Sequence, residues 1–149
     1  MVARYTGPRK SAASAFRSGL EEKVCKQLND AHIAHAYERY RISYLVPEKE
    51  HKYLPDFVLF NGIIVETKGL FDTADRAKHL LLRDQYPELD IRFVFSSSKS
   101  KLYKGSPTSY GMWCDKHGIK YADKLIPLAW LKEKGSKIPD GVLKEVGSK

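Results

Sequence analysis

The feature that most constrains this fold is a pair of apolar runs on either side of the dipeptide Asn61-Gly62. Residues 53–60 precede the dipeptide and residues 63–67 follow it. An Asn-Gly pair between two apolar runs is typical of a β-hairpin. Because residues 57–60 and 63–65 are apolar without alternation, both faces of the hairpin should be covered. The sequence therefore predicts a buried hairpin in an α/β domain.

Charged residues interrupt this apolar hairpin in one specific pattern. Pro55-Asp56 is followed, after nine residues, by Glu66-Thr67-Lys68. Two carboxylates brought together can hold Mg²⁺, which prefers oxygen ligands, while a phosphate completes its coordination shell. Lys68 lies two residues after Glu66, so both side chains point to the same face of the strand. The pattern predicts a catalytic metal site, although turn chemistry at Asp56 and a solvated Glu-x-Lys pair would be the simpler interpretation.

The metal hypothesis also predicts the register of the hairpin. A two-residue turn at Asn61-Gly62 would pair Asp56 with Thr67 and place Asp56 and Glu66 on opposite faces. A three-residue turn over residues 60–62, with Gly62 left-handed, pairs Asp56 with Glu66 instead. The apolar pattern fits both registers, so only the chemistry favours the second.

A helix expected at residues 19–31 supplies a third candidate carboxylate. Its start, Ser18 to Glu21, has the S-x-x-E form of a capping box. Glu21 borders the apolar stripe and Glu22 points away from it, the stripe being Leu20, Val24, Leu28 and Ala31. A carboxylate beside an apolar face needs a partner. A metal or a cation is the natural candidate, and a simple capping role is the alternative.

The remaining elements follow from periodicity and from Gly and Pro positions. A long strand is expected at residues 36–46, then a linker at 47–51. A helix capped by Thr73 should cover 73–86, with Ala77, Leu80 and Leu81 facing inward. We further expect a strand at 91–95, a polar loop at 96–106, a helix at 108–117 closed by Gly118, a strand at 119–122 and a helix at 127–133. Residues 1–15 read as a basic tail, 16–134 as the folded domain and 135–149 as a loosely ordered end.

Charge and composition restrict the partners. The chain has 26 Lys and Arg against 18 Asp and Glu, a net charge of +8. That excess favours a polyanion but does not separate DNA from RNA or a membrane surface. No apolar run approaches the about 20 residues that span a bilayer, and no secretory signal is present, so a cytoplasmic location is expected. Cys25 and Cys114 are isolated and should be small buried side chains.

Several basic side chains outside the motif could contact phosphates. They are Arg4, Arg9, Lys10 and Arg17 near the start, Arg76 and His79 on the second helix, and Lys99, Lys101 and Lys104 around Tyr103. For any one of them a solvated surface charge is the simpler interpretation. As a set they predict affinity for nucleic acid that does not depend on base sequence. His79 and His117 lack ligands at workable spacing for a metal.

Several segments of the sequence point to one family. They are residues 16–21, Pro55-Asp56-Phe57, Asn61-Gly62-Ile63, residues 65–70, residues 94–98 and residues 101–111. With these segments the chain resembles the endonuclease I family of T-seven-like bacteriophages, from about Phe16 to Leu131. These proteins are Holliday-junction resolvases of the superfamily whose motif is P-D followed by D/E-x-K.

The resemblance implies a restriction-endonuclease-like mixed sheet flanked by helices, in an intertwined homodimer that cuts branched DNA. The catalytic residues would be Glu21, Asp56, Glu66 and Lys68. Two divalent ions per site, Mg²⁺ with Mn²⁺ able to substitute, would be held by the three carboxylates and the Thr67 carbonyl. Products would carry a 5′-phosphate and a 3′-hydroxyl. The crossover between chains would lie at residues 47–52, so Glu21 would complete the partner's site, and a phage protein of this kind would act in the host cytoplasm.

Two other interpretations stay open at this point. One is a different enzyme of the same superfamily, such as a mismatch nickase or a restriction-type nuclease. The other is a non-catalytic basic module for RNA or DNA, in which Asp56, Glu66 and Lys68 are structural. Within the nuclease hypothesis, Lys68 could orient water, shift its proton or screen the phosphate.

Overall fold

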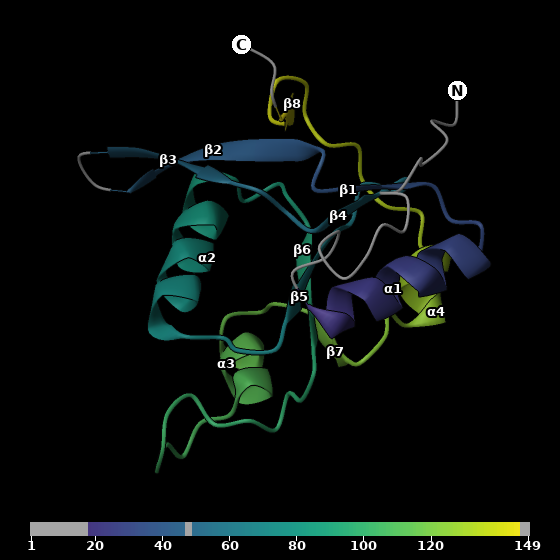
Figure 1. Ribbon diagram of the computed structural model, residues 1–149. Helices are drawn as coiled ribbons and strands as arrows, with labels where there is room; N and C mark the ends of the chain where they lie inside the picture. Colours follow the sequence, from purple (N-terminus) through teal and green to yellow (C-terminus); the bar gives the residue numbers. More distant parts are fainter. Residues whose placement is uncertain (1–17, 47–48, 147–149) are drawn as a thin grey trace.

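A mixed five-stranded sheet forms the centre of the protein (Figure 1). The computed structural model describes residues 18–46 and 49–146. The strand order is β1-β4-β5-β6-β7, antiparallel across β1, β4 and β5 and parallel across β5, β6 and β7. The strands are β1 (His35–Tyr37), β4 (Phe57–Leu59), β5 (Ile64–Lys68), β6 (Ile91–Phe95) and β7 (Tyr121–Asp123).

Helices cover both faces of this sheet, as expected for an α/β protein. On one face, α1 (Gly19–Asp30) and α4 (Leu128–Lys132) pack in a core that includes Val65 of β5. On the other face, α2 (Thr73–Gln85) packs in a core that includes Ile64. The third core joins α3 (Tyr110–Lys116) to the aromatic residues of β6. Successive residues at the start of β5 therefore face two different cores, which explains the unbroken apolar run over residues 63–65.

The register of the central hairpin is the one that the chemistry predicted. Phe57 pairs with Val65, so the next position places Asp56 opposite Glu66. The turn has three residues, closed by a 3.0 Å bond from the Gly62 N–H to the Leu59 carbonyl. Gly62 has a φ of 88°, and a Cβ there would lie 2.0 Å from the Ser136 carbonyl oxygen. Glycine is required at this position both by the backbone conformation and by the close approach.

The long strand and the linker expected before the hairpin need correction. The strand divides into β1 and β2 (Tyr40–Val46), with Glu38 at a φ of 47° in the break. The linker residues from Lys49 belong to β3 (Lys49–Tyr53), which pairs antiparallel with β2. This pairing sets Ile42 against Tyr53, and both side chains are fully buried. Burial of that pair on the second core explains why the segment forms a strand.

The inward face of α2 also differs from the prediction. Asp72, not Thr73, caps the helix, accepting a bond from the Asp75 N–H. The buried residues are His79 and Leu82, whereas Leu80 is exposed. The His79 ring packs edge-on against Phe93, with centroids 4.7 Å apart. An aromatic core partner therefore rotates the helix away from the face that the leucines alone would favour.

The C-terminal segment packs on the domain, although the sequence predicted a loose end. Ile138, Val142 and Leu143 join the second core, and β8 (Lys144–Glu145) pairs with β2 to complete a small sheet of order β3-β2-β8. The Asn61 amide donates to the carbonyls of Trp130 and Glu133, at 2.9 and 3.0 Å. Trp130 and Glu133 therefore hold the turn of the central hairpin, and the residues that follow them pack on the second core.

The other elements lie within a few residues of their predicted positions. The helices expected at 19–31, 108–117 and 127–133 are α1, α3 and α4, and the strand at 91–95 is β6. Gly118 has the left-handed conformation expected after a helix end, with a φ of 68°. Cys25 and Cys114 are both free and buried. No helix of the described part of the chain is long and apolar enough to cross a membrane.

Candidate active site

The structure brings together the four residues that the sequence singled out. Asp56 directly precedes β4, Glu66 and Lys68 lie on β5, and Glu21 lies in the first turn of α1. The three carboxylates are buried, with exposed fractions of 6% for Glu21, 3% for Asp56 and 4% for Glu66. Three acidic side chains buried at one place carry a large desolvation cost unless a cation or hydrogen bonds compensate them.

Asp56 is held by the residue between Glu66 and Lys68. Its Oδ2 accepts two hydrogen bonds from Thr67, one from the backbone N–H at 2.9 Å and one from the hydroxyl at 2.7 Å. Both donors bind one oxygen, Oδ2, and within the described residues the other oxygen, Oδ1, accepts no hydrogen bond. This geometry fixes the carboxylate while it leaves an oxygen that could bind a cation.

A fourth carboxylate, Glu38, was not predicted from the sequence. One ligand oxygen each from Glu21, Glu38 and Asp56 lie within 4.8 Å of one another, a grouping suited to a metal ion. The Glu38 N–H also donates to the Asp56 carbonyl at 3.1 Å. Glu38 sits at the left-handed break between β1 and β2, where no spacing rule marks a ligand. Only the tertiary structure reveals it.

Glu66 lies beside that group and has its own partners. The Tyr53 hydroxyl donates to Glu66 Oε2, and the Lys68 ammonium lies 3.9 Å from Oε1. Lys68 also lies 3.2 Å from Asp75 Oδ1 of α2. The ammonium is thus placed between two carboxylates and is only 16% exposed. Tyr53 was not singled out in the sequence, because its role depends on the β2–β3 pairing.

Glu21 has the capping role that the sequence suggested, and its side chain also reaches the carboxylate group. Its N–H donates to the Ser18 hydroxyl at 3.1 Å, which is the capping interaction. Its buried carboxylate accepts a short hydrogen bond from the Tyr37 hydroxyl at Oε2. The exposed neighbour Glu22 shares neither environment. Glu21 is therefore a capping residue whose side chain reaches the carboxylate group.

The pKa values show that negative charge at the site is not fully compensated. Burial, followed by repulsion from Asp56, raises the pKa of Glu66 to about 8. Burial and repulsion from Glu21 raise the pKa of Asp56 to about 6, although Thr67 opposes the shift. Lys68 lowers both values but does not restore them. Oxygen donors with unbalanced negative charge fit a hard divalent cation such as Mg²⁺ or Mn²⁺.

Only some of the candidate DNA contacts have side chains exposed to solvent. Lys99, Lys101 and Lys104 are exposed, whereas Arg76 donates within the protein to the Phe71 carbonyl at 2.6 Å. The prediction for His79 is wrong, because this side chain is 1% exposed. Burial also lowers its pKa well below the usual value, so the ring is neutral. The residues Arg4, Arg9, Lys10 and Arg17 lie outside the described part of the chain.

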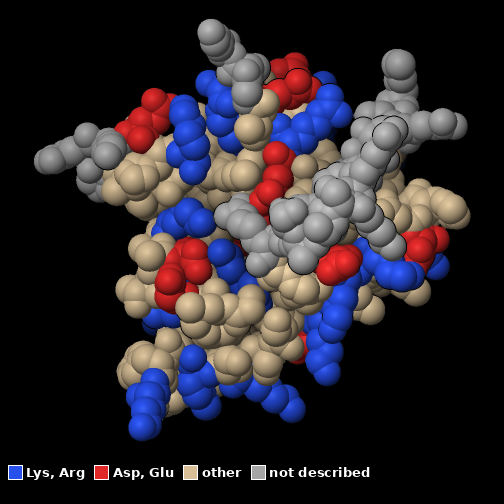
Figure 2. Space-filling model, in the orientation of Figure 1, with Lys and Arg blue, Asp and Glu red and all other residues tan. Residues whose placement is uncertain are grey.

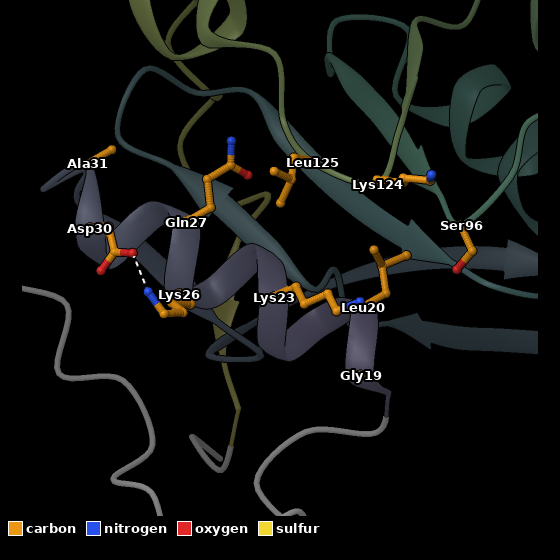
Figure 3. Close-up of a pocket in the computed structure, with 10 residues that line it drawn as sticks. All are labelled: Gly19, Leu20, Lys23, Lys26, Gln27, Asp30, Ala31, Ser96, Lys124 and Leu125. Carbon is orange, nitrogen blue, oxygen red and sulfur yellow. Dashed lines mark hydrogen bonds and ion pairs between the residues drawn. The ribbon is translucent and has the colours of Figure 1, made fainter.

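A groove of about 1000 Å³ lies between α1 and the segment that carries Lys124 and Leu125 (Figure 3). Its lining includes Lys23 and Lys26 of α1 and, across from them, Lys124. Ser96 lines one end, and its N–H donates to the Lys68 carbonyl at 3.0 Å. One end of the groove therefore adjoins the end of β5, the strand that carries Glu66 and Lys68, and Lys26 in the lining is paired with Asp30 at 2.6 Å. The sequence singled out none of these three lysines.

Fold and site together define an α/β protein with buried carboxylates and one lysine at the ends of adjacent strands. The model of the family described as phage endonuclease I matches residues 2–149. The chain belongs to the phage endonuclease I family, which confirms the resemblance seen in its sequence.

Two relatives show how far the similarity extends. Endodeoxyribonuclease 1 of Enterobacteria phage T3 is 66% identical over 125 residues, which cover 84% of this chain and 82% of that protein. Endonuclease I of Escherichia phage T7 is 61% identical over 135 residues, 91% of each chain. Both alignments span most of the chain, so the similarity extends well beyond a short motif.

Proposed function

We propose that this protein is a metal-dependent endodeoxyribonuclease that cuts four-way and other branched DNA, leaving 5′-phosphate and 3′-hydroxyl ends. The observation that carries the proposal is the convergence of Glu21, Asp56 and Glu66 beside Lys68. The family membership supports it, because the relatives are named endonuclease and endodeoxyribonuclease. A structural role alone gives no account of buried carboxylates with raised pKa values at one place.

The residues that would hold two divalent ions are Glu21, Asp56, Glu66 and the backbone carbonyl of Thr67, with Glu38 as a further oxygen donor. Bound there, the ions supply Lewis-acid stabilisation of the phosphate and an activated water. Thr67 orients Asp56 through two hydrogen bonds. The hydroxyls of Tyr37 and Tyr53 orient Glu21 and Glu66 in the same way.

Lys68 is the one basic group that we place in the chemistry. Its ammonium lies between Glu66 and Asp75, so its position is held from both sides. A fixed positive charge at this point stabilises the extra negative charge that develops on the phosphate during hydrolysis. The same position allows it to orient the attacking water or to shift its proton.

Affinity for DNA would come from the basic surface outside the site. Figure 2 shows Lys and Arg side chains at the lower end of the molecule, where the loop between β6 and α3 projects. The groove lysines beside α1 are a second basic region, and Arg4, Arg9, Lys10 and Arg17 of the sequence would contribute further positive charge. Such contacts bind phosphates of any sequence, which suits an enzyme selective for DNA shape.

We further infer a restriction-endonuclease-like homodimer in which each active site uses both chains. In the single chain, α1 and β1 pack on the chain's own β4 and β5, and only residues 47 and 48 separate β2 from β3. If β2 and β3 ran on as one strand, α1, β1 and β2 would reach a partner and make the same contacts there. Two equivalent sites would suit a substrate that needs two cuts.

The first test compares a four-way junction with two linear duplexes of the same sequence, one fully paired and one mismatched, with and without Mg²⁺. We expect metal-dependent cleavage of the junction in preference to either duplex, with a 5′-phosphate on each product. A preference for a mismatched duplex would favour the mismatch nickase. Binding without cleavage in Mg²⁺ and in Mn²⁺ would favour the non-catalytic module.

The second test mixes subunits that carry Glu21→Ala with subunits that carry Lys68→Ala. If the chains share their sites, a heterodimer combines both defects in one site and leaves the other intact, so nicking of one strand returns. If each site belongs to one chain, both sites of the heterodimer are inactive. Absence of nicking, with heterodimer formation confirmed by mass, would overturn the shared site.

A further inference from the structure

A structured loop between β6 and α3 projects from the domain, and we call residues 99–109 the finger (Figure 1). The Tyr110 N–H donates to the Ser100 carbonyl at 2.8 Å, and the Leu102 N–H donates to the Thr108 carbonyl at 3.0 Å. Lys101 and Ser109 form an antiparallel bridge between the two sides. The finger therefore has the ladder of a short hairpin.

The tip of the finger is closed by its own hydrogen bonds. The Ser106 N–H donates to the Tyr103 carbonyl at 3.0 Å, and Gly105 takes a φ of 86° in this turn. The Ser106 hydroxyl donates to the Thr108 carbonyl at 3.0 Å and so braces the returning strand. These bonds fix the backbone on which the Tyr103 side chain is carried.

Tyr103 is the exposed aromatic residue at this tip. Its exposed fraction is 63%, and it is the only tyrosine in residues 18–46 and 49–146 that is exposed. Leu102 beside it packs against the third core, so Leu102 anchors the finger while Tyr103 faces solvent. A large aromatic ring presented to solvent on an ordered backbone is suited to a partner with a flat apolar face.

The charge around the ring identifies the class of partner. Lys99, Lys101 and Lys104 are all exposed, and residues 96–109 include no acidic side chain. Lysines beside an exposed aromatic ring are the combination that binds nucleic acid through phosphates and stacked bases. The chain enters the finger from the end of β6, where the Ser96 N–H donates to the carbonyl of Lys68 on β5.

We propose that Tyr103 stacks on an unstacked DNA base at the branch and so favours branched DNA over duplex. The inference rests on the proposed function and adds the residue that recognises the branch. Every base in a duplex has both faces covered, whereas a branch point can expose one. The lysines of the finger bind any backbone, so within the finger the ring is the group that distinguishes the two substrates.

The test measures binding of a junction and of an equal-length duplex in Ca²⁺, with Tyr103→Ala, Tyr103→Phe and Tyr103→Trp. Tyr103→Ala should lose about tenfold in affinity for the junction and keep duplex affinity within about twofold. The Phe and Trp variants, which keep an aromatic face, should bind as wild type. Phe60→Ala is the matched control, because Phe60 is equally exposed, at 67%, on the central hairpin turn.

A second readout reports stacking directly. A 2-aminopurine placed at the branch should be quenched by the wild type and by Tyr103→Phe, but not by Tyr103→Ala. Equal losses of Tyr103→Ala on junction and duplex, or no loss and unchanged quenching, would overturn the proposal. A wild type without preference for the junction would overturn the proposed function instead. In that case quenching of 2-aminopurine at a single-stranded end still decides whether Tyr103 stacks.

Discussion

The substitution Glu66→Gln should stabilise the metal-free protein while it destroys the site. Glu66 is buried, and its pKa is raised to about 8 by burial and by Asp56. Glutamine has the same shape and can still accept the Tyr53 hydroxyl bond at its amide oxygen. The substitution therefore removes a buried acid that resists ionisation without opening a cavity.

The size of the effect follows from linkage between protonation and folding. At about pH 7.5 the unfolded chain has lost the Glu66 proton, while the folded chain retains it, so stability falls as pH rises. Each pH unit between the ordinary pKa of Glu66 and its raised pKa costs the folded state about 1.4 kcal/mol of stability. At about pH 7.5 this destabilisation approaches about 4 kcal/mol. Asp56 shares part of the repulsion, and the glutamine NH₂ needs a partner, so we expect a gain of about 2 kcal/mol. For a domain of this size the Tm should rise by about 6 °C.

Thermal unfolding in EDTA, followed by circular dichroism at about pH 5 and about pH 7.5, measures this gain. It should nearly vanish at the lower pH, because about pH 5 lies close to the ordinary pKa of 4.5, where the linkage contribution is below about 1 kcal/mol. Glu22→Gln is the matched control, because Glu22 is exposed on the same chain and should not change the Tm. A Glu66→Gln protein that is less stable than wild type at about pH 7.5, or equally stabilised at both pH values, would refute the reasoning.

Three further predictions address the same site. An alanine at Glu21, Glu66 or Lys68 should lower the cleavage rate at least about 1000-fold and keep junction affinity within about threefold. Glu22→Ala is the control, and its inactivity would refute the assignment within α1. The variants Tyr37→Phe and Tyr53→Phe should weaken Mg²⁺ binding by about tenfold in calorimetry, with Tyr44→Phe as control; unchanged binding would show that these hydroxyls do not position the carboxylates. Mg²⁺ affinity should rise between about pH 6 and about pH 8. Metal binding requires Asp56 and Glu66 to be ionised, and their pKa values are raised to about 6 and about 8. A Mg²⁺ affinity that does not change over this range would contradict the shifts.

Local rules predicted the parts of the site that depend on neighbouring residues in the chain. The hairpin register followed from the need to place Asp56 and Glu66 on one face, and the glycine at position 62 made the three-residue turn possible. The position of Glu21 followed from helical periodicity and its capping box. In both cases a short segment carries the geometry, so the sequence contains most of the information.

Features that depend on distant segments could not be predicted. Glu38 joins the carboxylates only because the chain breaks between β1 and β2, and Tyr53 reaches Glu66 only because β3 pairs with β2. His79 counted as a basic surface residue, yet its ring is buried beside Phe93. Residues 135–146 looked polar and irregular, but their three apolar side chains fit a core built by other elements.

Asp56 gives the most direct test of the central claim. Its carboxylate is held by Thr67, is repelled by Glu21 and itself repels Glu66. The measurement is the single-turnover rate at which Asp56→Asn cuts a four-way junction in saturating Mg²⁺, with binding measured on the same samples in Ca²⁺. The account predicts a rate at least about 1000-fold below wild type with junction affinity within about threefold. Cleavage by Asp56→Asn within about tenfold of wild type would show that these carboxylates are not the catalytic centre.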